Sequence, residues 1–433
     1  MRIRNILLGG MFVVLMAGCS KDETVDYSTM GSVDAYVSFG VKTDTQTKAT
    51  TDDSGTNVFN NEANIKSLTA YIFKISGADT ILAANKTVSL TTGETTINEI
   101  KHLNVKVTPT SDGTSSSDTF VAVFLGNCEI SSTPSTLTNL RKMVLTKNAD
   151  NYAFGDYLPM VSKIIKFTGL KPNIKTETLT TTSTTFYENW VKTGGGITTT
   201  EASTTDPETI SASLYPSSDY VVMTRLISRV QVESISVKLT DYPGASLKVV
   251  GVALANVKPQ STFEAGTGDY LRGYSSTAYA PVQYWIAPNS SIKDSFKSSD
   301  YEIKAANGAT TTTTFENTDT KKFIKYIFSN GARTSNDVNA AHTDGIYETG
   351  LIIIADFTNA ANVTTRTHMR VLLKDASVDN ITKVLPNYIY KLTISVTGEG
   401  SPNEDDLLLN AHVSAKVVVN PWNVVDITEN DAN

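Results

Sequence analysis

Apolar and polar residues alternate in short runs from one end of the chain to the other, and this alternation limits the fold more than any other feature. In the clearest run, VDAYVSFGV at residues 33–41, every second residue is apolar: Val33, Ala35, Val37, Phe39 and Val41. Successive side chains of a β-strand point to opposite faces, so the run predicts a strand with one apolar face. Further strands are expected at 65–75, 86–90, 95–100, 103–109, 119–127, 220–240, 246–257, 350–358, 368–374 and 387–400, whereas residues 137–145 are the best of few helix candidates. The pattern therefore predicts an all-β protein.

The length of 433 residues exceeds that of one ordinary domain and suits two. A polar segment ends near SLYP, and a second series of strands follows it, so we expect the domain boundary near residue 216. This boundary gives an N-terminal domain at 49–215 and a C-terminal domain at 216–433. A threonine-rich stretch at 176–213 has few apolar residues and reads as an insertion or a long loop on the first domain.

The first 18 residues resemble an export signal that ends at a lipidation site. Two arginines precede the apolar run of residues 6–16, which is too short to span a bilayer as a mature helix. The sequence Met16-Ala17-Gly18-Cys19 resembles a bacterial lipoprotein box, in which the cysteine is acylated. An ordinary secretory signal with a chance cysteine is the alternative. The acidic sequence after Cys19 resembles those that accompany surface export of lipoproteins in Bacteroidetes.

A polar segment follows the strand at 33–41. In residues 42–57, KTDTQTKATTDDSGTN, Ala49 is the only apolar residue, and Lys48 precedes it. Such a segment is expected to be exposed and open to a trypsin-like protease. A cut there would separate the early strand from the rest of the chain.

The sequence offers no catalytic or metal-binding constellation. Its four histidines lie in separate segments without metal-ligand spacing, at His102, His342, His368 and His412. Nucleophile elbows, phosphate loops and dinucleotide fingerprints are missing from it. A net charge of −7 without a dense basic cluster argues against nucleic acid as a partner. We therefore expect neither an enzyme nor a cofactor or a metal.

Several polar groups have both a functional and a structural interpretation. The acidic clusters Asp52-Asp53 and 404–406 and the loop 112–118 are better explained as solvated turns than as cation sites. Cys128 ends an apolar strand and suits a buried, inert thiol. Arg225 and Arg229 could clamp an anion, but pairing with carboxylates across a sheet surface is the more frequent arrangement.

A second alternating run near the C-terminus matches the first in pattern. Its apolar residues are Ala411, Val413, Ala415, Val417 and Val419. Five buried apolar side chains, some of them small, stabilise a strand in a groove by about 8 kcal/mol. If the early strand fills the edge groove of a sheet until the tether is cut, the late strand of another copy could replace it. Such head-to-tail exchange does not close on itself and grows a filament.

These runs, in this order, resemble the Bacteroidales fimbrillins, the type V pilins of fimbrial shafts. The resemblance is carried by Thr47-Lys48-Ala49 at the maturation cut, by IKSLTAYIFKISG (65–77), by TFVAVFLGN (119–127), by the Arg225/Arg229 strand and by the C-terminal run from residue 387. It implies two tandem β-sandwich domains, a propeptide at 19–48 with a removable strand, cleavage between Lys48 and Ala49, and a donor strand at 407–427 with Trp422 as an anchor.

The resemblance also implies where the protein acts and with what. We expect an outer-membrane lipoprotein precursor and then a surface fimbria for adhesion, in which the partners are other copies, related pilins, a maturation protease and a host glycan or protein receptor. A shaft subunit is favoured over a tip or anchor subunit. The alternative is a non-polymerising surface lipoprotein that binds glycans through Trp190 and Trp285.

Overall fold

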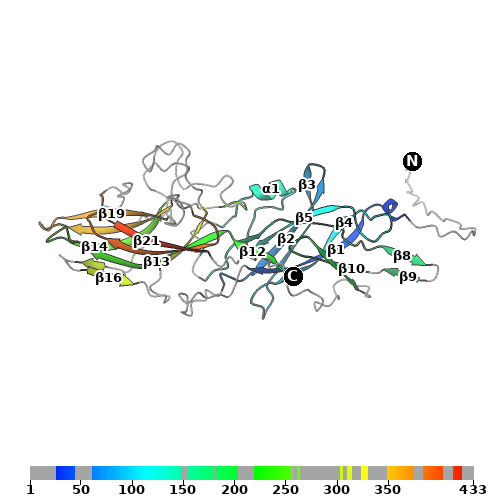
Figure 1. Cartoon of the computed structure of the whole chain (residues 1–433), viewed down its shortest axis with the longest axis horizontal. Helices are drawn as coiled ribbons and strands as arrows, with labels where there is room; N and C mark the ends of the chain where they lie inside the picture. The colour runs from blue at the N-terminus through cyan, green and yellow to red at the C-terminus, as the bar shows by residue number, and fades with distance from the viewer. Residues whose placement is uncertain are drawn as a thin grey trace, which may run out of the picture.

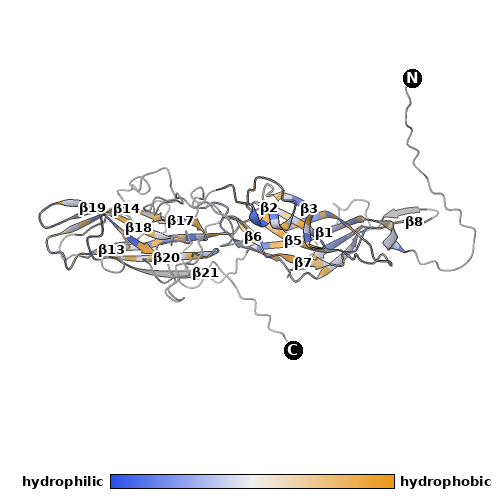
Figure 2. Ribbon diagram, turned by 90° about the horizontal axis from the view of Figure 1, so that it is seen from above, coloured by the Kyte–Doolittle hydropathy of each residue, from blue (hydrophilic) through white to orange (hydrophobic). Residues whose placement is uncertain are grey.

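The structure is a computed structural model, and it is almost entirely β-stranded, which confirms the prediction of an all-β protein (Figure 1). It describes residues 26–43, 61–147, 152, 155–178, 181–184, 186–202, 219–255, 257, 261–263, 303–305, 310–314, 323–329, 349–373, 384–402 and 413–421. Two β-sandwich domains follow one another along the long axis of the molecule, and apolar strands run through both of them (Figure 2). No helix in the described ranges is long and apolar enough to cross a membrane.

The first domain is built on a 10-stranded sheet that folds over its own core. Its strands are β1 (Val33–Thr43), β2 (Ser67–Ser76), β3 (Asp79–Ser89), β4 (Glu99–Val107), β5 (Thr119–Gly126), β6 (Met160–Ser162), β7 (Ile165–Thr168), β10 (Phe186–Val191), β11 (Ile197–Ala202) and β12 (Val221–Arg225). A short 3-10 helix, η1 (Tyr27–Met30), precedes β1. The helix α1 (Leu137–Lys142) is shorter than the expected segment 137–145, and Thr136 caps its first turn by accepting from the main-chain N–H of Asn139.

Turn residues set the register of the first domain. β2 and β3 form a hairpin in which Gly77 has φ 61°, a left-handed conformation that glycine adopts without steric cost. Asn127 ends β5 with φ 54°, and its side-chain oxygen accepts from the main-chain N–H groups of Lys66 and Ser67 at 2.7 and 3.2 Å. Its amide donates to the main-chain oxygens of Asn64 and Leu158. The asparagine therefore ties three segments together at one end of the sheet.

The second domain packs a 5-stranded sheet against a 4-stranded sheet. The larger sheet contains β13 (Ile227–Lys238), β16 (Thr310–Thr314), β17 (Phe323–Phe328), β20 (Tyr388–Val396) and β21 (Val413–Pro421), and the smaller one contains β14 (Ser246–Ala255), β15 (Ile303–Ala305), β18 (Gly350–Thr358) and β19 (Thr364–Leu372). Inward residues of both sheets, such as Val230 and Ile353, form one buried core. This arrangement is a β-sandwich.

The domain boundary lies later than the sequence indicated. β12 pairs with β1 and β6 in the first domain, whereas β13 pairs with β16, β17 and β20 in the second. Leu226 alone separates β12 from β13. The sheets therefore divide at Leu226 and not near residue 216, because one nearly continuous strand serves both domains.

A buried ionic cluster joins the domains. Nη1 of Arg229 lies 3.0 Å from Oε2 of Glu62, whose other oxygen accepts from the hydroxyl of Tyr326. Nε of Arg225 donates to the main-chain oxygen of Glu62 at 2.9 Å, and its Nη1 donates to Asn387 at 3.1 Å. Burial raises the pKa of Glu62 more than the two arginines lower it. Arg229 thus pairs with a carboxyl group, but inside the domain joint and not across an open sheet surface, and Arg225 donates to the main chain of the same glutamate.

The threonine-rich region at 176–213 is not a plain loop. It contributes to β8 (Lys175–Thr178) and contains β9 (Thr181–Thr184), which form a separate two-stranded ribbon. It also contains β10 and β11, which belong to the main sheet of the first domain. Threonine favours extended backbone, so a strand can form here without a run of alternating apolar residues.

Candidate functional site: the slot filled by the first strand

β1 lies inside the first domain and has strand neighbours on both sides. β4 runs antiparallel along one side, from Val33 opposite Val107 to Gly40 opposite Glu99. On the other side β1 pairs in parallel first with β10 and then, from Val41, with β12. We call the space between these neighbours the β1 slot. The sequence led us to expect an edge groove, whereas β1 occupies an interior position.

The apolar face of β1 is completely buried. Ala35, Val37, Phe39 and Val41 each have 0% exposure, whereas Val33 at the start of the strand is partly exposed. The ring of Phe39 meets the edges of two other rings, with centroid distances of 4.8 Å to Phe124 and 5.8 Å to Phe167. These contacts place Phe39 at the centre of the core beneath the slot.

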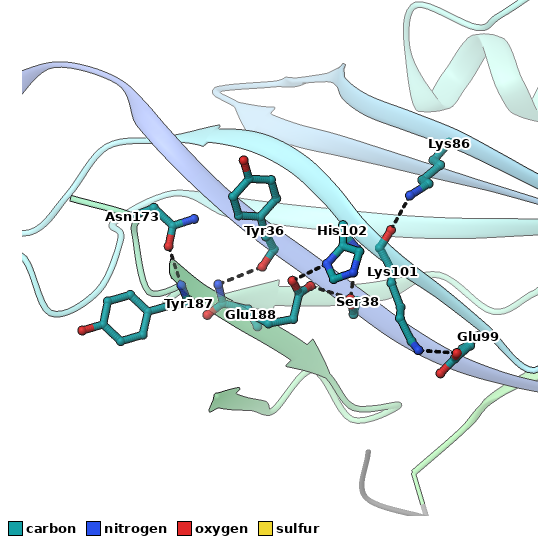
Figure 3. A network of polar contacts seen from close by, with 10 residues as sticks. Tyr36, Ser38, Lys86, Glu99, Lys101, His102, Asn173, Tyr187 and Glu188 are labelled. Carbon is teal, nitrogen blue, oxygen red and sulfur yellow. Dashed lines mark hydrogen bonds and ion pairs between the residues drawn. The ribbon is translucent and has the colours of Figure 1, made fainter. Parts of the chain in front are cut away.

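A polar residue of β1 is buried as deeply as the apolar ones. Ser38 has 0% exposure, and its hydroxyl donates to Oε1 of Glu188 on β10 (Figure 3). Nδ1 of His102 on β4 lies 2.8 Å from Oε2 of the same glutamate, and the main-chain N–H of His102 donates to the Ser38 hydroxyl at 3.1 Å. Glu188 also has 0% exposure. One buried cluster thus joins β1 to the strands on both of its sides.

His102 has an unusual backbone in this cluster. Its φ is 55°, in the left-handed region, and it lies where the pairing of β1 with β4 shifts register between Val37 and Phe39. The irregularity is a β-bulge, which redirects side chains and main-chain groups. Here it brings the N–H of His102 to the hydroxyl of Ser38.

Asn189 holds the main chain of β1 through its side chain. Its amide donates to the main-chain oxygen of Tyr36 at 3.0 Å and to that of Lys171 at 3.1 Å. Its oxygen accepts from the N–H of Lys171 at 2.9 Å. Asn189 is fully buried and lies next to Glu188, so two consecutive residues of β10 bind β1 by side-chain hydrogen bonds.

The predicted donor strand occupies a different position in its domain. Among the described strands, β21 is the last of its sheet and pairs with β20, from Tyr388 opposite Pro421 to Val396 opposite Val413. Val413 is 4% exposed. Ala415, Val417 and Val419 lie within β21, whereas Ala411 and Trp422 lie outside the described residues.

Other predicted functional residues fall outside the described ranges as well. These are Cys19, Lys48, Ala49 and Trp285, so their roles stay predictions. Trp190 is described and is only 2% exposed, on β10 opposite Ser38. A ring buried in the sheet cannot stack on a sugar, so Trp190 does not support the alternative of a glycan-binding protein.

The remaining candidates have structural surroundings. Sγ of Cys128 lies 3.1 Å from the main-chain oxygen of Gly126, and burial raises the pKa of this thiol to about 12. Asp112 stabilises a hairpin loop by accepting from Thr110 and Thr114. Within the described part of the chain, no three His, Cys, Asp or Glu side chains come together as a metal site would need.

Sequence reasoning did not find the cluster of Ser38, Glu188 and His102. These residues are up to 150 positions apart, and each lies in a different strand. The only local signal was a serine in the middle of the most apolar alternating run. Recognising its partners requires the pairing of β1 with β4 and β10, which no short-range pattern encodes.

Comparisons with known proteins agree with this fold. Residues 35–212 match the family model of the major fimbrial subunit protein (FimA), a span that begins on β1 and extends past β11. The fimbrilin FimA of Porphyromonas gingivalis W83 is 17% identical, with a TM-score of 0.53, and the alignment covers 91% of this chain and 99% of that one. A candidate cell adhesion protein of Parabacteroides distasonis ATCC 8503 is 14% identical, with a TM-score of 0.52, and the alignment covers 90% and 100% of the two chains.

At these identities the solved structures establish a common fold, and the family model adds a likeness in sequence over residues 35–212. No sequence among the curated proteins matches the chain. The matched span contains the whole β1 slot except β12, together with the cluster that surrounds Ser38. Residues 35–212 are therefore similar to the family of major fimbrial subunit proteins (FimA), and the chain shares its fold with a solved fimbrilin and a solved candidate cell adhesion protein.

Proposed function

We propose that the protein is a shaft subunit of a cell-surface fimbria and that it polymerises by strand exchange once β1 has been cut away. The observation that carries this proposal is the contrast in pairing between two strands of similar pattern. β1 fills an interior slot of the first domain, whereas β21 has one neighbour among the described strands, at the edge of a sheet of the second. When β1 leaves, the strands beside the slot become a template for pairing with a new strand. β21, at the edge of its sheet, can pair with another molecule instead.

Cleavage controls when the slot becomes available. While β1 is joined to its own domain, its effective concentration is about millimolar or higher, so a strand from another molecule cannot compete. A cut after Lys48 removes this advantage because β1 is then a separate peptide. Its departure leaves unpaired main-chain groups on β4 and β10 and an apolar cavity around Phe124.

The geometry of the exchange produces a filament. The slot lies in the first domain and the donor in the second, and the two domains follow one another along the long axis (Figure 1). Donation from the second domain of one copy to the first domain of the next is a head-to-tail contact between different surfaces. Such contacts generate open chains of subunits.

The proposed lipid at Cys19 links cleavage to release of the subunit from the membrane. Cys19 precedes β1, so a cut after Lys48 separates the subunit from its membrane anchor in the same step that opens the slot. Membrane release and polymerisation competence are therefore coupled. A Lys-directed or trypsin-like protease is the expected processing partner.

The test is controlled proteolysis of the full-length chain. Brief trypsin treatment, followed by mass spectrometry and electron microscopy, should give a cut after Lys48 and filaments. Lys48→Ala should prevent both, whereas Lys142→Ala on α1 should prevent neither. Truncation after Gly400 should leave cleavage intact and abolish filaments.

Two outcomes would contradict the proposal. Cleaved protein that has lost β1 yet stays monomeric at high concentration would exclude strand exchange. Filaments formed equally well by the chain truncated after Gly400 would exclude β21 as the donor. Saccharide binding by a cleaved, monomeric chain would instead favour the glycan-binding alternative.

A further inference from the structure

We propose that Ser414 of the incoming strand takes the place of Ser38 beside Glu188 and His102, and thereby fixes the register in which two copies join. This inference rests on the strand exchange proposed above and adds the residue that selects its register. It starts from what β1 leaves behind. Once β1 has gone, Glu188 has lost a hydroxyl donor, and the main-chain N–H of His102 has lost its acceptor.

The vacated position requires a small side chain that can both donate and accept a hydrogen bond. Ser38 donates one hydrogen bond to Glu188 and accepts another from the main-chain N–H of His102, and both Ser38 and Glu188 have 0% exposure. Among side chains, a hydroxyl group combines a donor and an acceptor on one small atom. A lysine can only donate, and a valine does neither. Leaving such buried polar groups without partners costs more than an ordinary hydrogen bond gains.

The choice of occupant is narrow because strand registers are discrete. A shift of the incoming strand by one residue would turn its apolar face away from the core, so only shifts of two residues are allowed. These shifts bring one of four residues to the position of Ser38: His412, Ser414, Lys416 or Val418. Ser414 is the only hydroxyl among them.

The two strands also match in sequence when the serines are aligned. Residues 35–41 read AYVSFGV and residues 411–417 read AHVSAKV, so Ala, Val, Ser and Val recur at the same spacing. In this alignment Val413 replaces Val37, Ala415 replaces Phe39, and Val417 replaces Val41. A strand that runs in the same direction as β1 can also repeat its antiparallel pairing with β4 and its parallel pairing with β10 and β12.

The strongest rival register is shifted by two residues. It aligns Ala411 with Val33 and brings the ammonium group of Lys416 towards Glu188. Charge attraction favours it, but a four-carbon stem would have to enter a space that a serine fills. The two registers therefore predict opposite effects for changes at 414 and 416.

The experiment compares filaments grown from protease-processed, full-length chains. The measured quantity is the rate at which subunits leave the filament in a fixed urea concentration. Ser414→Ala should raise this rate about tenfold, and Ser414→Thr, which keeps the hydroxyl, should stay within about threefold of the original. Lys416→Ala should leave the rate unchanged or lower it.

Controls separate joining from folding. Urea unfolding of each unprocessed variant measures what the substitution does to β21 in its own domain, and that change should be smaller than the change in filament dissociation. Equal rates of filament dissociation for the original protein and Ser414→Ala would overturn the register. Equal rates for Ser414→Ala and Ser414→Thr would overturn it as well. So would faster dissociation of Lys416→Ala while Ser414→Ala stays unchanged. Failure of the unsubstituted, cleaved protein to form filaments would overturn the proposed function itself, and this inference with it.

Discussion

β1 and β21 are similar in sequence pattern but opposite in structural position. β1 has partners on both sides and an apolar face with 0% exposure from Ala35 to Val41. In the described part of the second domain, β21 ends its sheet and pairs with β20 on one side. The difference teaches that the β1 slot and the proposed donor strand are not equivalent parts. Removing β1 would take an interior strand from its domain, whereas removing β21 would take an edge strand.

The same comparison explains why exchange would need a protease. In the alignment of the two serines, Phe39 of β1 corresponds to Ala415 of the donor. Phe39 fills the space between Phe124 and Phe167, and alanine would leave part of it empty. The resident strand would thus fit the slot better than the proposed donor. The proposed exchange would therefore depend on removing β1 and not on outcompeting it.

The largest expected effect comes from deleting each strand. A chain truncated after Gly400 has no donor strand. Further removal of residues 1–48 from it should lower the free energy of unfolding of the first domain by about 8 kcal/mol, because the burial of β1 is lost. Hydrogen exchange measured by mass spectrometry should then show β4 and β10 unprotected. Truncation after Gly400 alone should expose mainly β20. Equal loss of protection in the two domains would contradict the asymmetry.

The second prediction concerns one buried side chain in each strand. Phe39→Ala should lower the free energy of unfolding of the unprocessed chain by about 3–5 kcal/mol, because it opens a cavity between two aromatic rings. Val417→Asn should lower it less and should instead weaken the joining of subunits. Urea unfolding and filament dissociation measure the two quantities. A larger decrease in the free energy of unfolding for Val417→Asn than for Phe39→Ala would show that β21 is not available as a donor.

The third prediction addresses the polar cluster. Ser38→Ala in the unprocessed chain should cost about 1–3 kcal/mol, because Glu188 and the N–H of His102 each lose a partner inside the sheet. Ser76→Ala, at an exposed end of β2, is the matched control and should be neutral. Unfolding in urea compares the two. A neutral Ser38→Ala would mean that the cluster does not help to hold β1.

Much of this fold could be predicted from alternation alone. The strands around Val37, Ile72 and Val123 bury one or both faces in the core, so their apolar residues reveal them. Most of β3 was missed because this strand alternates between exposed and half-buried residues and has no fully buried face. β11 was missed because threonines replace the apolar residues that a pattern search needs, whereas β10 was missed because the buried polar pair Glu188-Asn189 interrupts its aromatic and apolar residues.

The position of β1 could not be predicted in the same way. Alternation describes the faces of a strand but not its neighbours, so an edge and an interior strand with one apolar face look alike. The pairing of Val37 with both Leu103 and Asn189 joins segments far apart in the chain. The predicted domain boundary differs from the division at Leu226 for the same reason. β12 and β13 form one continuous run in sequence, and only the strands with which each one pairs assign them to different domains.

The smallest expected effect tests the direction of the incoming strand. Ala415→Phe should slow filament dissociation about tenfold, because a ring placed as Phe39 was would again meet Phe124 and Phe167. Val413→Phe is the matched control: in the direction of β1 it would put a ring where Val37 fits at 0% exposure, and it should speed dissociation. A strand entering in the reverse direction with Ser414 still beside Glu188 would bring Val413 to the position of Phe39. The two substitutions would then exchange their effects, which would reverse the assigned direction while leaving the role of Ser414 intact.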